Sequence, residues 1–166
     1  MHMSSRALIF ASVLMCMAGL LSCQSQQKAG AEPTRSKDVS RDLSIDDARG
    51  GHTLKRHVSR TDEQLRDRLQ HEKNISAAST YTDRETAERV VGTAIQDSRD
   101  KVQRWIARGE RRPNLVLDYT EPSDAIGRVM NRGAMGSVPC DHAIVILKAD
   151  GEGDYYVLTS YPECRP

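Results

Sequence analysis

Two segments near opposite ends of the chain carry side chains suited to proton transfer and phosphate binding. His57 offers an imidazole, whose unperturbed pKa of about 6.5 lets it take or give a proton near neutral pH. Arg68 offers a permanent planar charge that matches phosphate oxygens. Thr159 and Tyr161 are two residues apart, so on a β-strand both hydroxyls project from one face. Metal-free phosphodiester cleavage needs a base, donors for the phosphorane and an acid for the leaving oxygen, and these four groups are the material for it.

The imidazole is expected on a short helix. Leu54, His57 and Val58 stand at i, i+3 and i+4, which places His57 on the apolar face, directed inward or into a cleft. A lone histidine in such a position is more often a hydrogen-bonded core residue than a catalyst. The position alone therefore leaves both interpretations open.

A second helix is expected to carry the guanidinium. Residues 61–64 read Thr-Asp-Glu-Gln, the form of a capping box, and Leu65 and Leu69 make a narrow apolar stripe after it. Arg68 lies on the margin of that stripe, from which it can reach the edge of the same cleft. Taken alone, it has the ordinary interpretation of a solvated or salt-bridged arginine.

The rest of the chain changes from helical to strand periodicity. A second capping box at 82–85 precedes apolar positions that suit one long or two consecutive helices, ended by Gly109. Three β-rich runs follow, at residues 114–119, 142–148 and 155–161. Helices first and strands later predict an α+β domain, with N-terminal helices packed on a C-terminal antiparallel sheet.

The N-terminus has the form of an export signal. Residues 1–22 combine a positive start, an apolar run too short for a comfortable membrane span and a small-residue junction. That junction ends at Cys23 and resembles the lipobox of bacterial lipoproteins, which predicts a lipid anchor; an ordinary cleaved signal with an incidental cysteine is the alternative. Residues 23–48 are expected to form the lipidated start and a flexible tether, and 49–166 one small domain. Gln24 favours sorting to the outer membrane in a cell with two membranes.

Cys140 and Cys164 remain after the signal, and an oxidising compartment allows a disulfide between them. They lie symmetrically about Glu152, the middle of a glycine-rich turn, so a hairpin centred there would bring them face to face. The bridge would hold the strand of Thr159 and Tyr161 against its neighbour. Two unpaired thiols are the alternative.

The composition excludes little but supports no other chemistry. The chain has 24 basic and 23 acidic residues, so it is close to neutral overall. Two basic groups could attract phosphates, although a solvated helix surface explains most of them. They are Arg49, Lys55, Arg56, Arg60, Arg66 and Arg68, and Arg104, Arg108, Arg111 and Arg112. Zinc-ligand spacing, a phosphate-cradling glycine loop and a nucleophile elbow are missing from the sequence, so we expect no metal and no cofactor.

Three motifs in order resemble the ribonuclease A-like toxin domain of bacterial contact-dependent growth inhibition proteins. They are His-Thr-x-x-x-His-Val at 52–58, Leu-x-x-Arg-Leu at 65–69 and Leu-Thr-x-Tyr-Pro at 158–162. The resemblance runs from about residue 50 to 162. It implies a ribonuclease A-like fold, an RNA substrate and a cognate immunity protein as a partner.

The resemblance also assigns roles. His57 would transfer the proton, Arg68 would clamp the transition state, Thr159 would read the base or position the phosphate, and Tyr161 would position the phosphate or assist proton transfer. His52, in the opening motif, is the strongest candidate for a second acid or base and has a structural interpretation too. Two other histidines compete with it, His71 and His142.

The resemblance has two departures and one difference of context. Ser59 stands where the pattern has glycine, and Tyr81 stands where it has phenylalanine. The toxins end very large proteins, whereas this domain follows a lipoprotein-like signal. The leading hypothesis is an exported, lipid-anchored ribonuclease that cleaves RNA without a metal through a 2′,3′-cyclic phosphate, as a toxin, a scavenging nuclease or an inactive relative. The alternative is a non-catalytic envelope lipoprotein that uses the fold to bind a partner.

Overall fold

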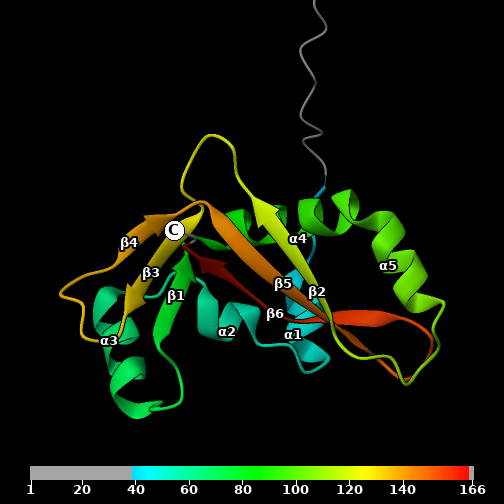
Figure 1. Ribbon diagram of the computed structural model, residues 1–166, viewed down its shortest axis with the longest axis horizontal. Coiled ribbons are helices and arrows are strands. Elements are labelled where there is room, and N and C mark those ends of the chain that lie inside the picture. The colour runs from blue at the N-terminus through cyan, green and yellow to red at the C-terminus, as the bar shows by residue number, and fades with distance from the viewer. Residues whose placement is uncertain (1–38, 165–166) are drawn as a thin grey trace, which may run out of the picture. The chain divides into compact units, whose positions relative to one another are not determined.

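Three helices, one strand, two helices and five strands follow one another along residues 39–164, the part of the chain that the computed structural model describes (Figure 1). The helices are α1 (Leu43–Ala48), α2 (Thr53–His57), α3 (Asp62–His71), α4 (Arg84–Asp97) and α5 (Arg99–Ile106). The strands are β1 (Ala77–Tyr81), β2 (Leu115–Thr120), β3 (Gly127–Asn131), β4 (Val138–Cys140), β5 (His142–Ala149) and β6 (Tyr155–Glu163). Residues 39–164 contain no helix of the length and hydropathy that a membrane span requires. The predicted signal peptide and Cys23 lie outside the described residues.

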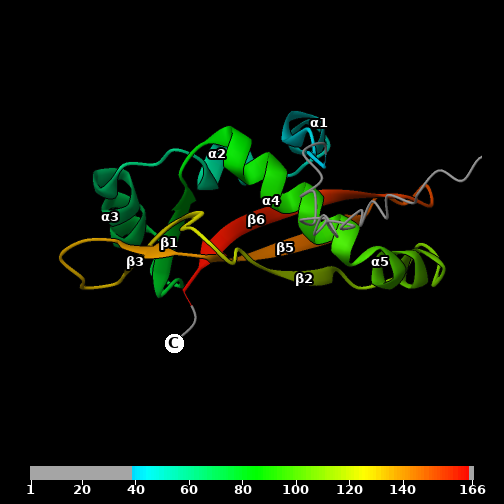
Figure 2. The ribbon, with the colours of Figure 1, turned by 90° about the horizontal axis from the view of Figure 1, so that it is seen from above.

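The strands form two antiparallel sheets of three, ordered β1-β3-β4 and β2-β5-β6. Figure 2 shows α1, α2, α3 and α4 on one side of the strands. The predicted α+β class, with helices packed on antiparallel strands, is thus confirmed. The expectation of a single C-terminal sheet is wrong, because β1 comes before α4 and pairs with β3. The short β1, β3 and β4 had no strong strand signal in the sequence.

The main core lies between α4 and the β2-β5-β6 sheet. Val90 and Val91 of α4 are fully buried, as are Leu117, Val145 and Val157 of the strands below. The expected helical region thus divides into α4 and α5, with Trp105 of α5 closing one end of the core. Burial of this apolar surface supplies the main driving force for the fold.

A smaller core seats α3 on the other sheet. Leu65 and Leu69 are buried against Ala78 and Met130. The predicted capping box at 61–64 is confirmed, since Thr61 Oγ1 accepts from the backbone of Gln64 and the Gln64 side chain accepts in return. The expected box at 82–85 is not the cap of α4, because the Asp83 carboxylate accepts from the Thr86 N–H instead.

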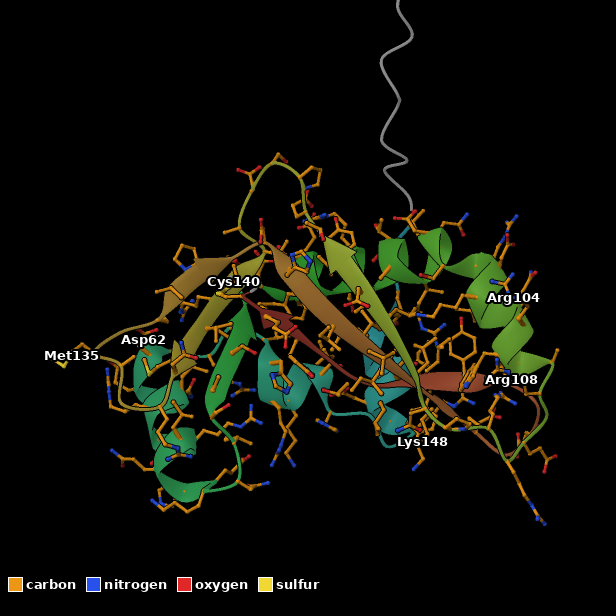
Figure 3. The ribbon with its side chains drawn as sticks, in the orientation of Figure 1. Asp62, Arg104, Arg108, Met135, Cys140 and Lys148 are labelled. Carbon is orange, nitrogen blue, oxygen red and sulfur yellow. A yellow bond between two sulfur atoms is a disulfide. The ribbon has the colours of Figure 1, made fainter. Side chains whose placement is uncertain are left out.

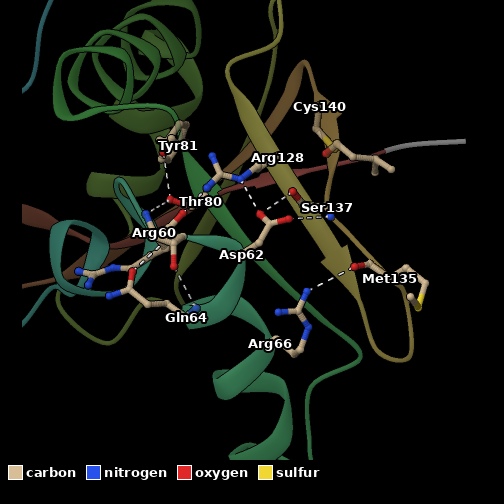
Figure 4. Close-up of polar contacts among 12 residues, drawn as sticks. Arg60, Asp62, Gln64, Arg66, Thr80, Tyr81, Arg128, Met135, Ser137 and Cys140 are labelled. Carbon is tan, nitrogen blue, oxygen red and sulfur yellow. Dashed lines mark hydrogen bonds and ion pairs between the residues drawn. The ribbon is translucent and has the colours of Figure 1, made fainter.

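Polar contacts fix the start of α3 to β3 and to the loop before β4 (Figure 4). Asp62 Oδ1 accepts from Arg128 Nε at 3.0 Å and from the Ser137 hydroxyl at 2.8 Å. Arg66 donates to the carbonyl of Met135 at 3.3 Å. These bonds set the position of the helix that carries Arg68.

Helix α1 corrects the predicted domain start. Leu43 and Asp46 are fully buried, and Asp46 Oδ1 accepts from the backbone N–H of Val157 in β6 at 2.9 Å. Arg41 neutralises this carboxylate through two hydrogen bonds. Residues 39–48 are therefore folded rather than part of a flexible tether, and the folded domain begins before residue 49.

The expected hairpin forms between β5 and β6, with Ala149 paired to Tyr155 across the turn. Cys140 and Cys164 are joined by a disulfide, with Cα atoms 5.1 Å apart. Its geometry differs from the expectation, because Cys140 (labelled in Figure 3) ends β4 rather than lying on the hairpin partner β5. The bridge therefore ties the end of β6 to the other sheet.

Candidate active site

One cleft, of about 430 Å³, is lined by all five residues predicted for proton transfer and phosphate binding. They are His52, His57, Arg68, Thr159 and Tyr161. The residues come from the N-cap and end of α2, from α3 and from β6, and β1 forms another wall. The structure thus brings together side chains that are about 100 residues apart in sequence.

Close packing of α2 on β6 places the two histidines. A side chain at Gly51 would collide with the carbonyl oxygens of Val157 and Asp46, so only glycine allows this approach. The N–H of His52 donates to the Leu158 carbonyl at 3.0 Å, and the N–H of Ser160 donates to Thr53 Oγ1 at 2.9 Å. These two bonds fix the N-terminal end of α2 to the strand.

A β-bulge in β6 aims the two hydroxyls at the cleft. Val157 and Thr159 pair with two consecutive residues of β5, so Leu158 is an extra residue without a partner in the ladder. Val157 faces the core before the bulge, and Ser160 faces it afterwards. Thr159 and Tyr161 are thereby turned to the cleft. The expectation that both project from one face is confirmed, and the bulge decides which face that is.

His57 is buried at the bottom of the cleft, with 6% of its surface exposed. Its Nδ1 lies 3.2 Å from the carbonyl oxygen of Ser79, and because a carbonyl only accepts, Nδ1 carries the proton. Nε2 is therefore left as the acceptor. Burial, followed by the charge of Arg68, lowers the pKa of His57 to about 3. The imidazole is neutral near pH 7, the form that a general base requires.

The two departures from the toxin motif have structural explanations. Ser59 has a φ of 53°, in the left-handed region that favours glycine. Its N–H donates to the backbone carbonyl of Tyr81 at 3.1 Å. The Tyr81 ring is fully buried, and its hydroxyl is 2.6 Å from the Ser160 hydroxyl. A tyrosine is accommodated there because β6 supplies a hydrogen-bond partner for its hydroxyl.

Arg68 presents a free edge of its guanidinium. Nε donates to Glu72 Oε1 at 3.3 Å, while Nη1 is buried and has no hydrogen-bond partner among the described residues. Thr159 Oγ1 is likewise buried and has no hydrogen-bond partner among the described residues. Unpaired buried polar atoms are costly, and both residues line the cleft, so a bound ligand with polar oxygens would satisfy them.

Tyr161 and His52 flank the imidazole of His57. The ring centroids of Tyr161 and His57 are 5.4 Å apart, and those of His52 and His57 are 6.4 Å apart. Burial and then the charge of Glu163 raise the pKa of Tyr161, which keeps its hydroxyl protonated. Burial and then the charge of Arg56 lower the pKa of His52, which favours its neutral form.

Other predicted groups lie elsewhere. His71 is exposed and bonds to the Asp67 carbonyl, and His142 bonds to Thr120 at the start of β5; neither lines the cleft. Arg104 lies on α5 and Arg108 lies just after it, at the opposite end of the sheets from Met135 (Figure 3). A second cleft of about 480 Å³ next to the site shares Arg68 and is lined by three of the other predicted cations, Lys55, Arg56 and Arg60.

Sequence reasoning missed several groups around the cleft. The Ser79 carbonyl belongs to the unpredicted strand β1. Glu163 follows Tyr161 by two residues on the same strand, and Glu72 follows Arg68 by four on the same helix, so ordinary strand and helix spacing would have indicated both.

Comparison with known proteins identifies a matching family and a similar solved structure. Residues 51–162 match the family model described as the bacterial CdiA-CT RNAse A domain. A solved structure, the CdiA-CT/CdiI complex from Y. kristensenii 33638, contains a chain similar to this one. The two share 31% sequence identity with a TM-score of 0.61, and the match covers 68% of this chain and 99% of the other. Comparison with curated proteins finds no match. Because this family model matches residues 51–162, more than half of the chain, the chain belongs to the bacterial CdiA-CT RNAse A domain family.

Proposed function

We propose that this domain is a metal-independent endoribonuclease that cleaves RNA by transesterification through a 2′,3′-cyclic phosphate. One observation carries the proposal: a neutral buried imidazole shares a cleft with an arginine and a threonine that each have a buried polar atom without a hydrogen-bond partner among the described residues. Membership of a ribonuclease A-like family supports the same reaction class.

The first half of the reaction is proton removal and attack. His57 Nε2 takes the proton of the ribose 2′-hydroxyl, while Ser79 holds Nδ1–H and keeps the ring in the required tautomer. The 2′-oxygen then forms a bond to phosphorus. Arg68 Nη1 and the Thr159 hydroxyl donate to the phosphorane oxygens, where the negative charge grows.

The second half is departure of the 5′-oxygen. As the P–O5′ bond breaks, this oxygen takes a proton, and the products are a 2′,3′-cyclic phosphate and a 5′-hydroxyl. We assign the donor role to Tyr161, because its raised pKa keeps the proton available near pH 7. His52 is suited to exchange protons with this region as a neutral imidazole, because its pKa is lowered.

The test is RNA cleavage in the presence of EDTA by residues 24–166, which retain α1. We expect fragments with cyclic-phosphate ends, and loss of cleavage in His57→Ala with the far-UV spectrum unchanged. His71→Ala, which removes an exposed histidine outside the cleft, is the matched control and should cleave like wild type. Undiminished cleavage by His57→Ala would contradict the assignment, and absence of wild-type cleavage would favour a non-catalytic binding role.

Export and partners belong to the same proposal. The lipobox-like junction supports export and a lipid anchor on Cys23 at the cell envelope, at the outer membrane or in the periplasm if the cell has two membranes. Fatty-acid labelling of wild type, lost in Cys23→Ser, would test this anchor. The similar chain is solved in a complex with CdiI, which supports a cognate immunity protein as a second partner besides RNA.

A further inference from the structure

Glu72 connects two arginines at the rim of the cleft. Its Oε1 accepts from Arg68 Nε at 3.3 Å and lies 3.3 Å from Arg56 Nη2. Arg68 is the more buried of the two arginines, with 19% of its side chain exposed against 47% for Arg56. A hydrogen bond to Nε constrains the plane of a guanidinium, because this nitrogen is part of the planar group.

Hydrogen bonds hold the backbone at Glu72, which fixes the point from which its carboxylate extends. Glu72 follows the last turn of α3, and its N–H donates to the Arg68 carbonyl at 2.8 Å. Arg132 donates to the Glu72 carbonyl at 2.8 Å and also binds the carbonyls of Leu69 and Ile75. One arginine from the end of β3 thus closes the C-terminus of the helix around this residue.

Glu72 and the reacting groups lie on different sides of Arg68. Arg68 lines both the catalytic cleft and the neighbouring cleft, whereas Glu72 lines only the neighbouring one. The carboxylate therefore engages Nε without entering the catalytic cleft, and Nη1 remains unpaired for a ligand.

We infer that Glu72 is a positioning residue for the cleavage reaction, a role that rests on the proposed ribonuclease function. It holds the Arg68 guanidinium in the orientation that the phosphorane requires. Its negative charge at the same time opposes binding of the RNA phosphates. The two effects act on different quantities, because orientation of Arg68 matters most where charge develops, while repulsion acts already on bound substrate.

These effects predict opposite changes in two kinetic constants. In Glu72→Ala, kcat on a single-stranded oligonucleotide should fall about tenfold because Arg68 loses its orientation. KM should fall about twofold to threefold because a negative charge has left the rim. Glu72→Gln keeps an acceptor for Nε without the charge, so it should restore most of kcat while KM stays low.

Matched variants separate this role from simple destabilisation. Asp67→Asn removes a carboxylate from the same helix and the same neighbouring cleft. KM should therefore fall as in Glu72→Ala, while kcat should stay near the wild-type value because Asp67 pairs with His71 rather than with Arg68. In an Arg68→Ala background, Glu72→Ala should leave kcat unchanged, because nothing remains to be positioned. Melting temperatures should be measured for all variants, and each is expected to be folded at the assay temperature.

The outcomes are distinguishable. Three results together support the inference in a wild-type protein that cleaves RNA. Glu72→Ala lowers kcat about tenfold, Glu72→Gln restores most of kcat, and Glu72→Ala has no effect on kcat in the Arg68→Ala background. If wild type cleaves RNA but Glu72→Ala has an unchanged kcat, the inference is overturned. It is also overturned if Glu72→Ala lowers kcat equally in the Arg68→Ala background. Both results leave the proposed function standing. A wild-type protein that cleaves no RNA overturns both.

Discussion

The buried His57 makes the stability of this protein depend on pH in a defined window. The unfolded chain binds a proton on this imidazole near its ordinary pKa of about 6.5, whereas burial and Arg68 lower the pKa in the folded chain to about 3. Between these values the unfolded state binds more protons. The free energy of unfolding therefore rises with pH across the window and falls on acidification.

The size of the effect follows from the two pKa values. From about pH 7 to about pH 5, the single site should remove about 2 kcal/mol from the free energy of unfolding. His57→Asn removes the titration but keeps a side-chain N–H for the Ser79 carbonyl, which His57 Nδ1 contacts. The variant should therefore lose about 2 kcal/mol less than wild type over the same pH change.

Urea unfolding with the disulfide intact measures this difference, and the single tryptophan, Trp105, is a buried fluorescent probe. His71→Asn is the control, because it removes an exposed imidazole without altering the cleft. An equal loss of stability in wild type and His57→Asn would refute the claim that His57 is neutral and desolvated in the folded protein.

Four other predictions concern the site and the frame that holds it. Arg68→Lys keeps the charge but loses the planar fork, so kcat should fall at least about tenfold, or about 1.4 kcal/mol, in oligonucleotide cleavage; unchanged turnover with weaker binding would reduce Arg68 to part of a basic surface. Tyr161→Phe should cleave RNA poorly but retain activity on a 3′-nucleotide aryl ester, whose leaving group needs no proton, and equal losses on both substrates would argue against the acid role. Reduction of Cys140–Cys164, with a sequence separation of 24, should cost about 3 kcal/mol by loop entropy and lower activity and melting temperature together; two alkylated thiols in non-reduced periplasmic protein would disprove the bridge. A fragment starting at residue 49 lacks α1 and should unfold at a clearly lower temperature than residues 24–166, and equal thermal denaturation curves would contradict the role given to α1.

Local sequence patterns predicted where the side chains of the cleft lie in those cases where residue spacing alone decides the direction of a side chain. The i, i+3, i+4 pattern around His57 gave a buried imidazole, and the alternation of Thr159 and Tyr161 gave two hydroxyls on one face. The capping box gave the start of α3, and with it the place of Arg68. Each of these features depends on residues within one turn or one strand.

Features set by distant contacts could not be predicted in this way. Helix α1 has few apolar residues, and it is ordered because Asp46 binds β6 over 100 residues later. Strand β1 is made of small residues apart from Tyr81, and it forms because β3 offers a partner. The disulfide has the expected partners in an unexpected place, since the chain leaves β4 at Cys140 before the hairpin begins.

The bulge at Leu158 also bears on how relatives of this protein should be judged. If the bulge were lost while Leu158 remained, uninterrupted alternation from Val157 would turn Thr159 and Tyr161 into the core and Ser160 toward the cleft. Such a chain would keep every reacting side chain and lose the arrangement that makes them useful. A homologue can thus be inactive with a full set of catalytic residues, and the register in which β6 pairs with β5 says more about activity than the presence of those residues does.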